Sequence, residues 1–161
     1  MQKISKLNPP ALAGVIRETS RAAAIAEIKN CVYDGADMID LHMSCLESAD
    51  FQTLKDIIGS SALPVLALNY NKKYDWSDAG FSEDERTKSL LAAVDAGAAG
   101  VDIQGYTFHL PSKDNFCGED NYPFTACKPK EVVTDKAVIA KQCELIDKVH
   151  ARGAEVPLSC H

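Results

Sequence analysis

The sequence lacks the features that mark several large classes of protein. No apolar run approaches the about 18 residues that cross a membrane, and residues 1–8 are polar, without the apolar core of an export signal. The formal net charge is −6 and the one short basic pair is Lys72-Lys73, so no basic surface for nucleic acid or an anionic membrane is expected. We therefore expect a cytoplasmic protein that acts on a small molecule, with no nucleic-acid or membrane partner.

Paired cysteine motifs and a phosphate-binding glycine loop are also missing. The chain has 6 cysteines but no Cys-x-x-Cys pair, and without an export signal they are expected to stay reduced. Cys117, Cys127 and His109 share one segment, at spacings that match no common zinc module. No Gly-x-Gly-x-x-Gly follows a strand, which argues against a Rossmann sheet. We expect no cofactor.

The composition is that of an ordinary globular domain. Apolar residues make up 46% and charged residues 25% of the 161 residues, which favours one domain. Short apolar runs predict buried strands at 11–16, 38–43, 64–68, 100–104 and 156–158. Capping residues and final glycines predict the helices between them: from Thr19 or Ser20 to about 34, 50–59, 82–97, and from Thr134 or Asp135 to 153.

An internal repeat links these elements. Gly-Ala-x-x-(Ile or Val)-Asp occurs at 35–40 and at 97–102, and Gly153-Ala154 begins a third copy. Each copy ends a helix and starts a buried strand, so we expect tandem βα units around a parallel sheet. A complete (β/α)8 barrel needs about 250 residues, and the chain therefore predicts about five of its eight units.

The fold class expected is thus α/β, a partial parallel (β/α) barrel of the TIM or aldolase type, as one domain over 1–161. Exposed edge strands are templates for aggregation, so we expect this to be the amino-terminal part of a longer barrel rather than a finished short protein. The long irregular segment at about 105–131 carries aromatic residues and predicts a packed loop or lid.

Polar residues stand at the ends of the predicted strands. Asp40 and His42 are two apart, as are Asp102 and Gln104, so each pair faces one side of its strand. His161 would project from the tip of the fifth strand. A barrel directs all five side chains to one mouth, and polar groups on buried strands are costly unless they are satisfied or used. Singly each has a structural explanation, whereas together they favour a site.

The same segments resemble the type I 3-dehydroquinate dehydratase family of aldolase-type barrels. The similar stretches are Gly-Ala-Asp-Met-Ile-Asp-Leu-His (35–42), Pro-Val-Leu-Ala-Leu (64–68), Gly-Val-Asp-Ile-Gln (100–104) and Leu-Ser-Cys-His (158–161). Ser159-Cys160-His161 is the most specific, since it resembles the family's Ser-x-His signature. The resemblance implies a shikimate-pathway lyase that dehydrates a cyclic hydroxy-ketone acid through a Schiff base, with His161 as general acid/base.

The sequence also departs from the family pattern. Where the family has Glu-x-Arg on the second strand this chain has Asp40-Leu41-His42, and where it has an arginine after the third strand this chain has Asn69-Tyr70. Its fourth strand ends Asp-x-Glu, here Asp102-Ile103-Gln104. We assign Asp40, His42, Tyr70, Asp102 and Gln104 to substrate binding, and without the two arginines the carboxylic acid substrate is expected to be a relative of dehydroquinate.

The resemblance places the imine-forming lysine on a sixth strand, which is not in this sequence. We therefore expect the 161-residue chain to be inactive alone, and to be completed by the rest of the barrel or to form a homo-oligomer. Lys72 and Lys73 could approach the mouth, although solvated loop charges are the simpler interpretation. Cys160 and His161 face opposite sides of a strand, which argues against a Cys–His nucleophile.

Two other functions stay open at this point. Asp40, His42, Asp102, Gln104 and His161 are suitable oxygen and nitrogen ligands for a divalent metal ion in a barrel isomerase or aldolase. A non-catalytic binding module that has kept the fold and lost the chemistry is the third possibility.

Overall fold

The computed structural model describes the chain except residues 1, 71–81, 106, 109–132 and 160–161. A short 3-10 helix, η1, precedes the first strand, and helices then alternate with strands. In chain order the elements are η1 (Ile4–Lys6), β1 (Ala13–Ile16), α1 (Arg21–Tyr33), β2 (Met38–His42), η2 (Met43–Cys45), α2 (Phe51–Gly59), β3 (Val65–Leu68), α3 (Glu83–Asp95), β4 (Gly100–Val101), β5 (Ile103–Gln104), α4 (Lys136–Ala151) and β6 (Leu158–Ser159).

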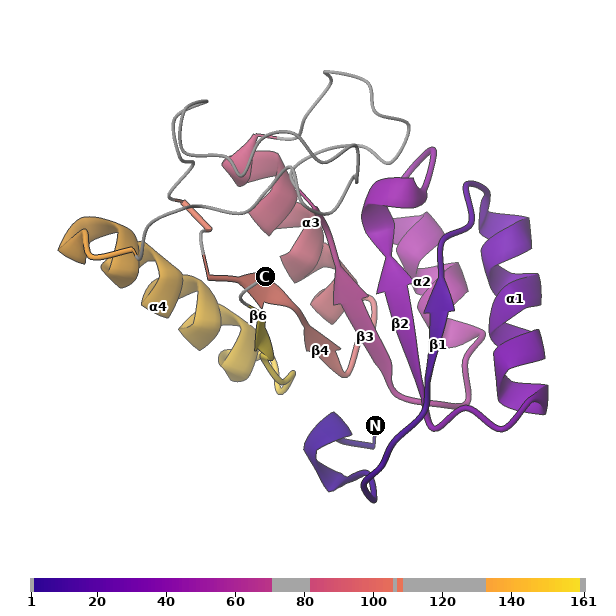
Figure 1. Cartoon of the computed structure of the whole chain (residues 1–161). Coiled ribbons are helices and arrows are strands. Elements are labelled where there is room, and N and C mark those ends of the chain that lie inside the picture. The colour runs from indigo at the N-terminus through magenta and orange to yellow at the C-terminus, as the bar shows by residue number, and fades with distance from the viewer. Residues whose placement is uncertain (1, 71–81, 106, 109–132, 160–161) are drawn as a thin grey trace, which may run out of the picture.

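All the strand pairs in the described part of the chain are parallel. The order β1-β2-β3-β4 forms one sheet, β5 pairs with β6, and a single bridge between Gly100 and Glu155 continues the second pairing toward β4. Figure 1 shows the strands side by side with the helices gathered on one side of the curved sheet. Sequential parallel strands joined by outer helices define a partial (β/α) barrel, which confirms the predicted fold class.

The hydrophobic core lies between the sheet and the helices. Alternate strand residues that face the helices are almost completely buried: Ile39, Leu41, Val65, Ala67, Val101 and Ile103. Leu54 and Ile57 of α2 and Leu90 of α3 meet them from the helix side, in the same cluster. Because side chains alternate along a strand, the residues between these positions occupy the opposite face, which we call the inner face.

The helix boundaries follow the predicted local signals. Ser20, Asp50, Ser82 and Asp135 each accept a hydrogen bond from a backbone N–H of the first turn, and Ser82 with Glu85 forms a capping box. Gly35, Gly97 and Gly153 follow helices α1, α3 and α4 with φ values of 87°, 110° and 82°. Glycine adopts this left-handed conformation without a steric cost, which allows the chain to turn into the next strand.

Several predicted boundaries shift in the structure. β1 begins at Ala13 rather than at 11, and β3 at Val65 rather than at 64, where the pairing of each with β2 begins. The strand expected at 156–158 is observed at Leu158–Ser159, because Pro157 has no N–H and offers only its carbonyl, to Ile103. The strand expected at 100–104 is divided at Asp102, beyond which the chain leaves the end of β3 and pairs with β6. The strand expected at 38–43 ends one residue early, where η2 begins. The predicted lid at about 105–131 lies almost wholly outside the described residues.

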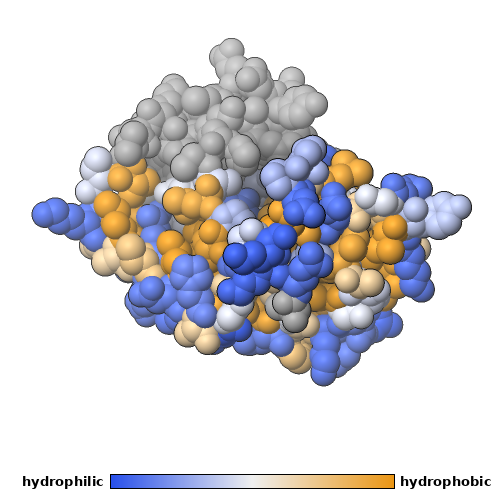
Figure 2. All heavy atoms as spheres, turned by 90° about the horizontal axis from the view of Figure 1, so that it is seen from below, coloured by the Kyte–Doolittle hydropathy of each residue, from blue (hydrophilic) through white to orange (hydrophobic). Residues whose placement is uncertain are grey.

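Figure 2 shows the molecule from below, where hydrophilic and hydrophobic residues are interspersed over the surface. Charged side chains in the described region pair between helices, as in Arg21 with Asp56 and Arg152 with Asp95. No helix in the described part of the chain is both long and apolar enough to cross a membrane.

Candidate functional site

Asp40 and His42 come together on the inner face of β2. They alternate with the buried Ile39 and Leu41, and His42 Nε2 lies 3.6 Å from Asp40 Oδ2. This distance suits an ion pair if the imidazole is protonated, and is long for a hydrogen bond. Asp40 Oδ1 is buried and has no hydrogen-bond partner among the described residues. A buried carboxylate oxygen in this state is a candidate contact for a ligand.

Tyr70 extends this pair across the end of β3. Its ring centroid lies 5.7 Å from that of His42, with the two planes tilted by 54°. Tilted rings at this separation form a favourable aromatic contact. The structure therefore brings together three of the predicted binding residues, from the ends of two neighbouring strands.

Asp102 and Gln104 follow on the same face. The Asp102 N–H donates to Ala67 O at 2.9 Å, which places Asp102 next to Leu68, the register partner of His42. Gln104 is register-paired with Ser159 of β6. Asp102 and Gln104 are buried, with 8% and 1% of their surfaces exposed. The predicted polar residues in the described part of the chain thus form a row over the carboxyl ends of β2 to β5.

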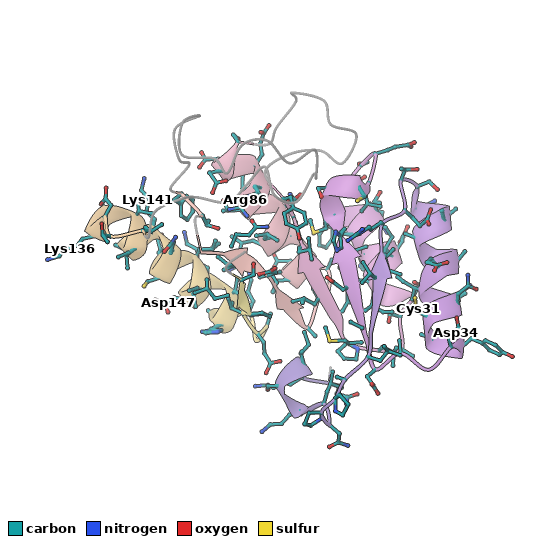
Figure 3. The ribbon with its side chains drawn as sticks, in the orientation of Figure 1. Cys31, Asp34, Arg86, Lys136, Lys141 and Asp147 are labelled. Atoms are coloured by element: carbon teal, nitrogen blue, oxygen red, sulfur yellow. The ribbon has the colours of Figure 1, made fainter. Side chains whose placement is uncertain are left out.

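A buried arginine from α3 joins this row. Arg86 has no exposed surface and donates from Nη1 to Gln104 Oε1 at 2.6 Å and from Nη2 to Thr107 Oγ1 at 2.7 Å. Nη1 also lies 3.3 Å from the Asn69 carbonyl oxygen, a longer contact. Figure 3 shows Arg86 on the side of α3 that faces the strands, whereas Lys136 points away from the body of the molecule.

Glu83 balances the charge of Arg86. Its two oxygens accept from Arg86 Nε at 2.9 Å and Nη2 at 2.8 Å, and one of them also accepts from the Phe108 N–H at 2.7 Å. This two-point ion pair holds the guanidinium in one orientation. The first turn of α3 is thereby fixed to the chain that follows Gln104, through Thr107 and Phe108.

Sequence reasoning missed Arg86 and also Arg17. Arg86 lies four residues before Leu90, on the helix stripe that continues through Ala93 and Val94, so a charge on an apolar stripe was the available signal. Arg17 comes one residue after the register pair Ile16–Leu41, level with His42 at the end of β1, and its side chain is exposed. Both are cationic residues near the carboxyl ends of the strands.

Several predicted residues cannot be placed. His161, Cys160, Lys72 and Lys73 lie outside the described residues, so the proposed proton-transfer group and its surroundings stay a prediction. Within the described ranges, no three His, Cys, Asp or Glu side chains gather closely enough to hold a metal ion.

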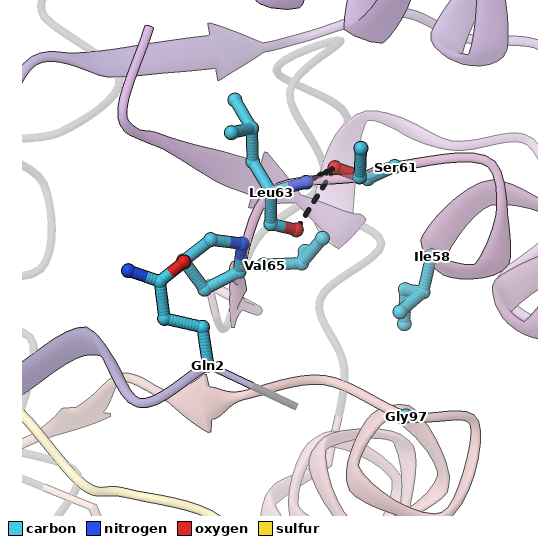
Figure 4. Close-up of a pocket in the computed structure, with 8 residues that line it drawn as sticks. Gln2, Ile58, Ser61, Leu63, Val65 and Gly97 are labelled. Atoms are coloured by element: carbon cyan, nitrogen blue, oxygen red, sulfur yellow. Dashed lines mark hydrogen bonds between the residues drawn. The ribbon is translucent and has the colours of Figure 1, made fainter.

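A small hollow lies at the opposite, amino end of the strands. It has a volume of about 170 Å³ and is lined by Gln2, Ile58, Ser61, Ala62, Leu63, Pro64, Val65 and Gly97. Figure 4 shows its serine hydrogen-bonded to Leu63: Ser61 Oγ accepts from the Leu63 N–H at 3.1 Å and donates to its carbonyl at 3.0 Å. The hydroxyl of Ser61 is therefore satisfied within the chain, and none of the predicted site residues lines the hollow.

The fold and the polar row define a class. A (β/α) barrel with polar side chains over the carboxyl ends of successive strands has the architecture of the aldolase-type barrel enzymes, which keep their chemistry at that end.

Known structures support this class. No family model and no curated protein sequence matches the chain. Its fold is similar to 3-dehydroquinate dehydratase from Geobacillus kaustophilus (TM-score 0.68, 10% identity, 99% of this chain and 55% of that one). The 3-dehydroquinate dehydratase from Enterococcus faecalis is also similar, with a TM-score of 0.63 and 16% identity over 94% of this chain and 53% of that one. The type I enzyme from Clostridium difficile has a TM-score of 0.63 and 15% identity over 94% of this chain and 50% of that one.

The predicted resemblance to type I 3-dehydroquinate dehydratases is thus confirmed for the fold. The chain spans about half the length of these enzymes. A mutant of mandelate oxidase shares the fold with a TM-score of 0.52 and 13% identity, over 91% of this chain and 41% of that one. Barrels of this type serve several chemistries, so activity must be argued from the residues at the strand ends.

Proposed function

We propose that the carboxyl ends of the strands bind a small cyclic hydroxy-ketone acid, and that the chain supplies part of the site of a 3-dehydroquinate dehydratase-like lyase. The observation that supports this most directly is the row of inner-face polar residues, Asp40, His42, Asp102 and Gln104, with Tyr70 packed against His42. The fold similarity to three dehydratases supports the same substrate class.

Binding would use an acidic residue of this row, Asp40, and a basic residue beside it, Arg17. A hydroxyl of the ligand can donate to Asp40 Oδ1, which has no partner among the described residues, and can accept from the imidazole of His42 when it is protonated. The ligand carboxylate would pair with Arg17, an exposed residue that directly follows β1 and is level with His42 in the strand register.

The proposed reaction is dehydration through an imine. A lysine amine adds to the ligand ketone and water leaves, which gives an iminium that can accept an electron pair. His161 removes a proton from the adjacent carbon and returns it to the hydroxyl that leaves as water. Hydrolysis of the imine then releases the unsaturated ketone and regenerates the lysine.

The lysine of this reaction has to come from outside the described residues. Every described lysine lies in the amino-terminal segment or on a helix, at positions 3, 6, 29, 55, 88, 136, 141 and 148. We propose that a segment completing the barrel, in the same chain or a partner, supplies it. Lys72 and Lys73, which follow β3, are the alternative source in this sequence.

Reductive trapping tests the imine. The protein is incubated with 3-dehydroquinate and borohydride, and peptide mass spectrometry locates the adduct. We expect a lysine adduct whenever the dehydrated product forms. His161→Asn should abolish the product but retain the adduct, because the imine forms before the proton transfer assigned to His161. If turnover occurs without a lysine adduct, and a chelator abolishes that turnover, the result would support a metal-dependent enzyme instead. Binding without any turnover, in the complete gene product, would support the binding module.

Calorimetry tests the binding row separately. His42→Gln should weaken 3-dehydroquinate binding roughly tenfold or more, since it removes a buried polar contact to the ligand. His150→Gln is the matched control, because His150 lies in the last turn of α4, on an exposed position. Equal affinities for the two variants would contradict the assignment of His42.

A further inference from the structure

The hydrogen bonds of Arg86 determine which end of the Gln104 amide faces the ligand. A guanidinium has only donors, so the atom 2.6 Å from Arg86 Nη1 must be the amide oxygen of Gln104. The amide nitrogen is then turned elsewhere. Gln104 Nε2 is buried and has no hydrogen-bond partner among the described residues. Gln104 therefore presents a fixed donor where an ionised glutamate would present only acceptors.

Ser159 supplies a second group beside this donor. It is the register partner of Gln104 across the β5–β6 pair, so the two side chains leave the sheet on the same face. The Gly105 N–H donates to the Ser159 carbonyl at 2.8 Å, which holds the strands together at this point. Ser159 Oγ is also buried without a hydrogen-bond partner in the described part of the chain. Two adjacent unsatisfied donors are costly unless a ligand engages them.

The surrounding charges indicate what kind of acceptor fits. Both oxygens of Glu83 bind Arg86, so the guanidinium charge is already balanced. Asp102 lies two residues before Gln104 on the same face. A carboxylate placed here would be repelled by Asp102 and would find no uncompensated cation in Arg86. A ketone oxygen is neutral and accepts two hydrogen bonds, which matches the two donors.

We propose that Gln104 and Ser159 together bind the ketone oxygen of the ligand, and that Arg86 is a positioning residue that holds the Gln104 amide in its donor orientation. Two donors on this oxygen polarise the carbonyl and make its carbon a better target for an amine. The ligand skeleton rests on the proposed function, whereas the choice of a carbonyl rests on the Arg86, Gln104 and Ser159 geometry alone.

The test compares two probes that differ only at one oxygen: a cyclohexanone carboxylic acid and its hydroxycyclohexane counterpart. Calorimetry or NMR titration of the chain should show a preference for the ketone of roughly tenfold. Gln104→Glu should abolish it, because the carboxylate still accepts from Arg86 and offers no donor. Ser159→Ala should reduce it by a smaller factor. Gln52→Glu, at an exposed position of α2, is the matched control and should leave the preference unchanged.

Arg86→Lys tests the positioning role. The lysine keeps a charge beside Glu83 but lacks the fork that reaches Gln104 and Thr107 together. The preference for the ketone probe should fall in this variant. The NMR signal of the Gln104 side-chain amide is identified by its absence in Gln104→Glu. In Arg86→Lys this signal should no longer shift when the ketone is added. A purely structural role would lower stability and leave the preference intact, which would overturn the assignment.

The outcomes separate this proposal from the proposed function. A Gln104-dependent ketone preference without 3-dehydroquinate turnover would retain the carbonyl site and reject the dehydratase activity. If 3-dehydroquinate is turned over, but Gln104→Glu leaves the ketone preference unchanged, the dehydratase activity would be retained and the carbonyl site rejected. A wild-type chain that binds both probes equally, or neither, overturns the carbonyl site.

Discussion

The two ends of the strands differ in how their polar groups are used. At the amino end, polar side chains are satisfied by nearby chain: Ser61 bonds to Leu63, Asp37 accepts from the Leu12 N–H, and Glu155 accepts from Ser5. At the carboxyl end, Asp40, Gln104 and Ser159 each keep a buried polar atom without a hydrogen-bond partner among the described residues. The first pattern stabilises a fold, and the second fits a site that a ligand completes.

The comparison also shows that the carboxyl end needs support from a helix. Glycine turns after helices α1, α3 and α4, which are local, lead into the strands at the amino end. The carboxyl end depends on Arg86, whose partners Gln104 and Thr107 are distant in sequence. Mutations should therefore affect stability alone at one end, and stability and binding together at the other.

Loss of Arg86 should have the largest effect. Arg86→Met leaves the Glu83 carboxylate without its partner and should lower the free energy of unfolding by about 3–5 kcal/mol, measured by denaturant titration. Arg21→Met is the control, because the exposed Arg21–Asp56 pair is expected to contribute less than about 1 kcal/mol. Similar losses for the two variants would show that the buried network contributes no more than a surface pair.

Alanine at Gly35 should have an intermediate effect, on stability alone. An added Cβ meets no atom within 4 Å, so the cost comes from the left-handed backbone, and about 1–2 kcal/mol is expected. Gly59→Ala is the matched control: its site is equally open, but it lies in helix α2 without a left-handed φ, so it should be neutral or stabilising. Ligand affinity should not change in either variant. A lower ligand affinity in Gly35→Ala would contradict the assignment of binding to the carboxyl end alone.

The pH dependence at Asp50 should be the smallest effect. The Thr53 N–H and hydroxyl, with Ser48, donate to this N-cap carboxylate and hold the pKa of Asp50 well below its ordinary value. A depressed folded pKa stabilises the protein above the ordinary value, and this contribution is lost as the pH falls toward the folded pKa. The stability difference between wild type and Asp50→Ala should therefore shrink below about pH 4. A difference that stays constant from pH 7 down to pH 3 would contradict this assignment.

Local rules allowed much of the fold to be predicted. The caps at Ser20 and Ser82 and the turn at Gly97 depend on neighbouring residues, so their sequence signals survive in the structure. The proximity of Asp40 and His42 follows from the two-residue period of a strand. These features need no knowledge of distant contacts.

Features that depend on tertiary contacts were harder to predict. Arg86 is on an apolar helix stripe, and only the folded chain brings Gln104 and Thr107 to it. The shift of β6 to Leu158 depends on which carbonyls and amides β5 offers around Pro157. The role of His161 stays a prediction, since it lies outside the described residues.

The central claim is that the carboxyl ends of the strands bind a ligand and the amino ends do not. It is tested most directly by titrating the 15N-labelled chain with 3-dehydroquinate and mapping the backbone amide shifts. We expect the largest shifts at His42, Asp102 and Gln104, with little change at Ser61 and Gly97 around the amino-end hollow. Shifts concentrated at Ser61 and Gly97, or no shifts at saturating ligand, would contradict the account.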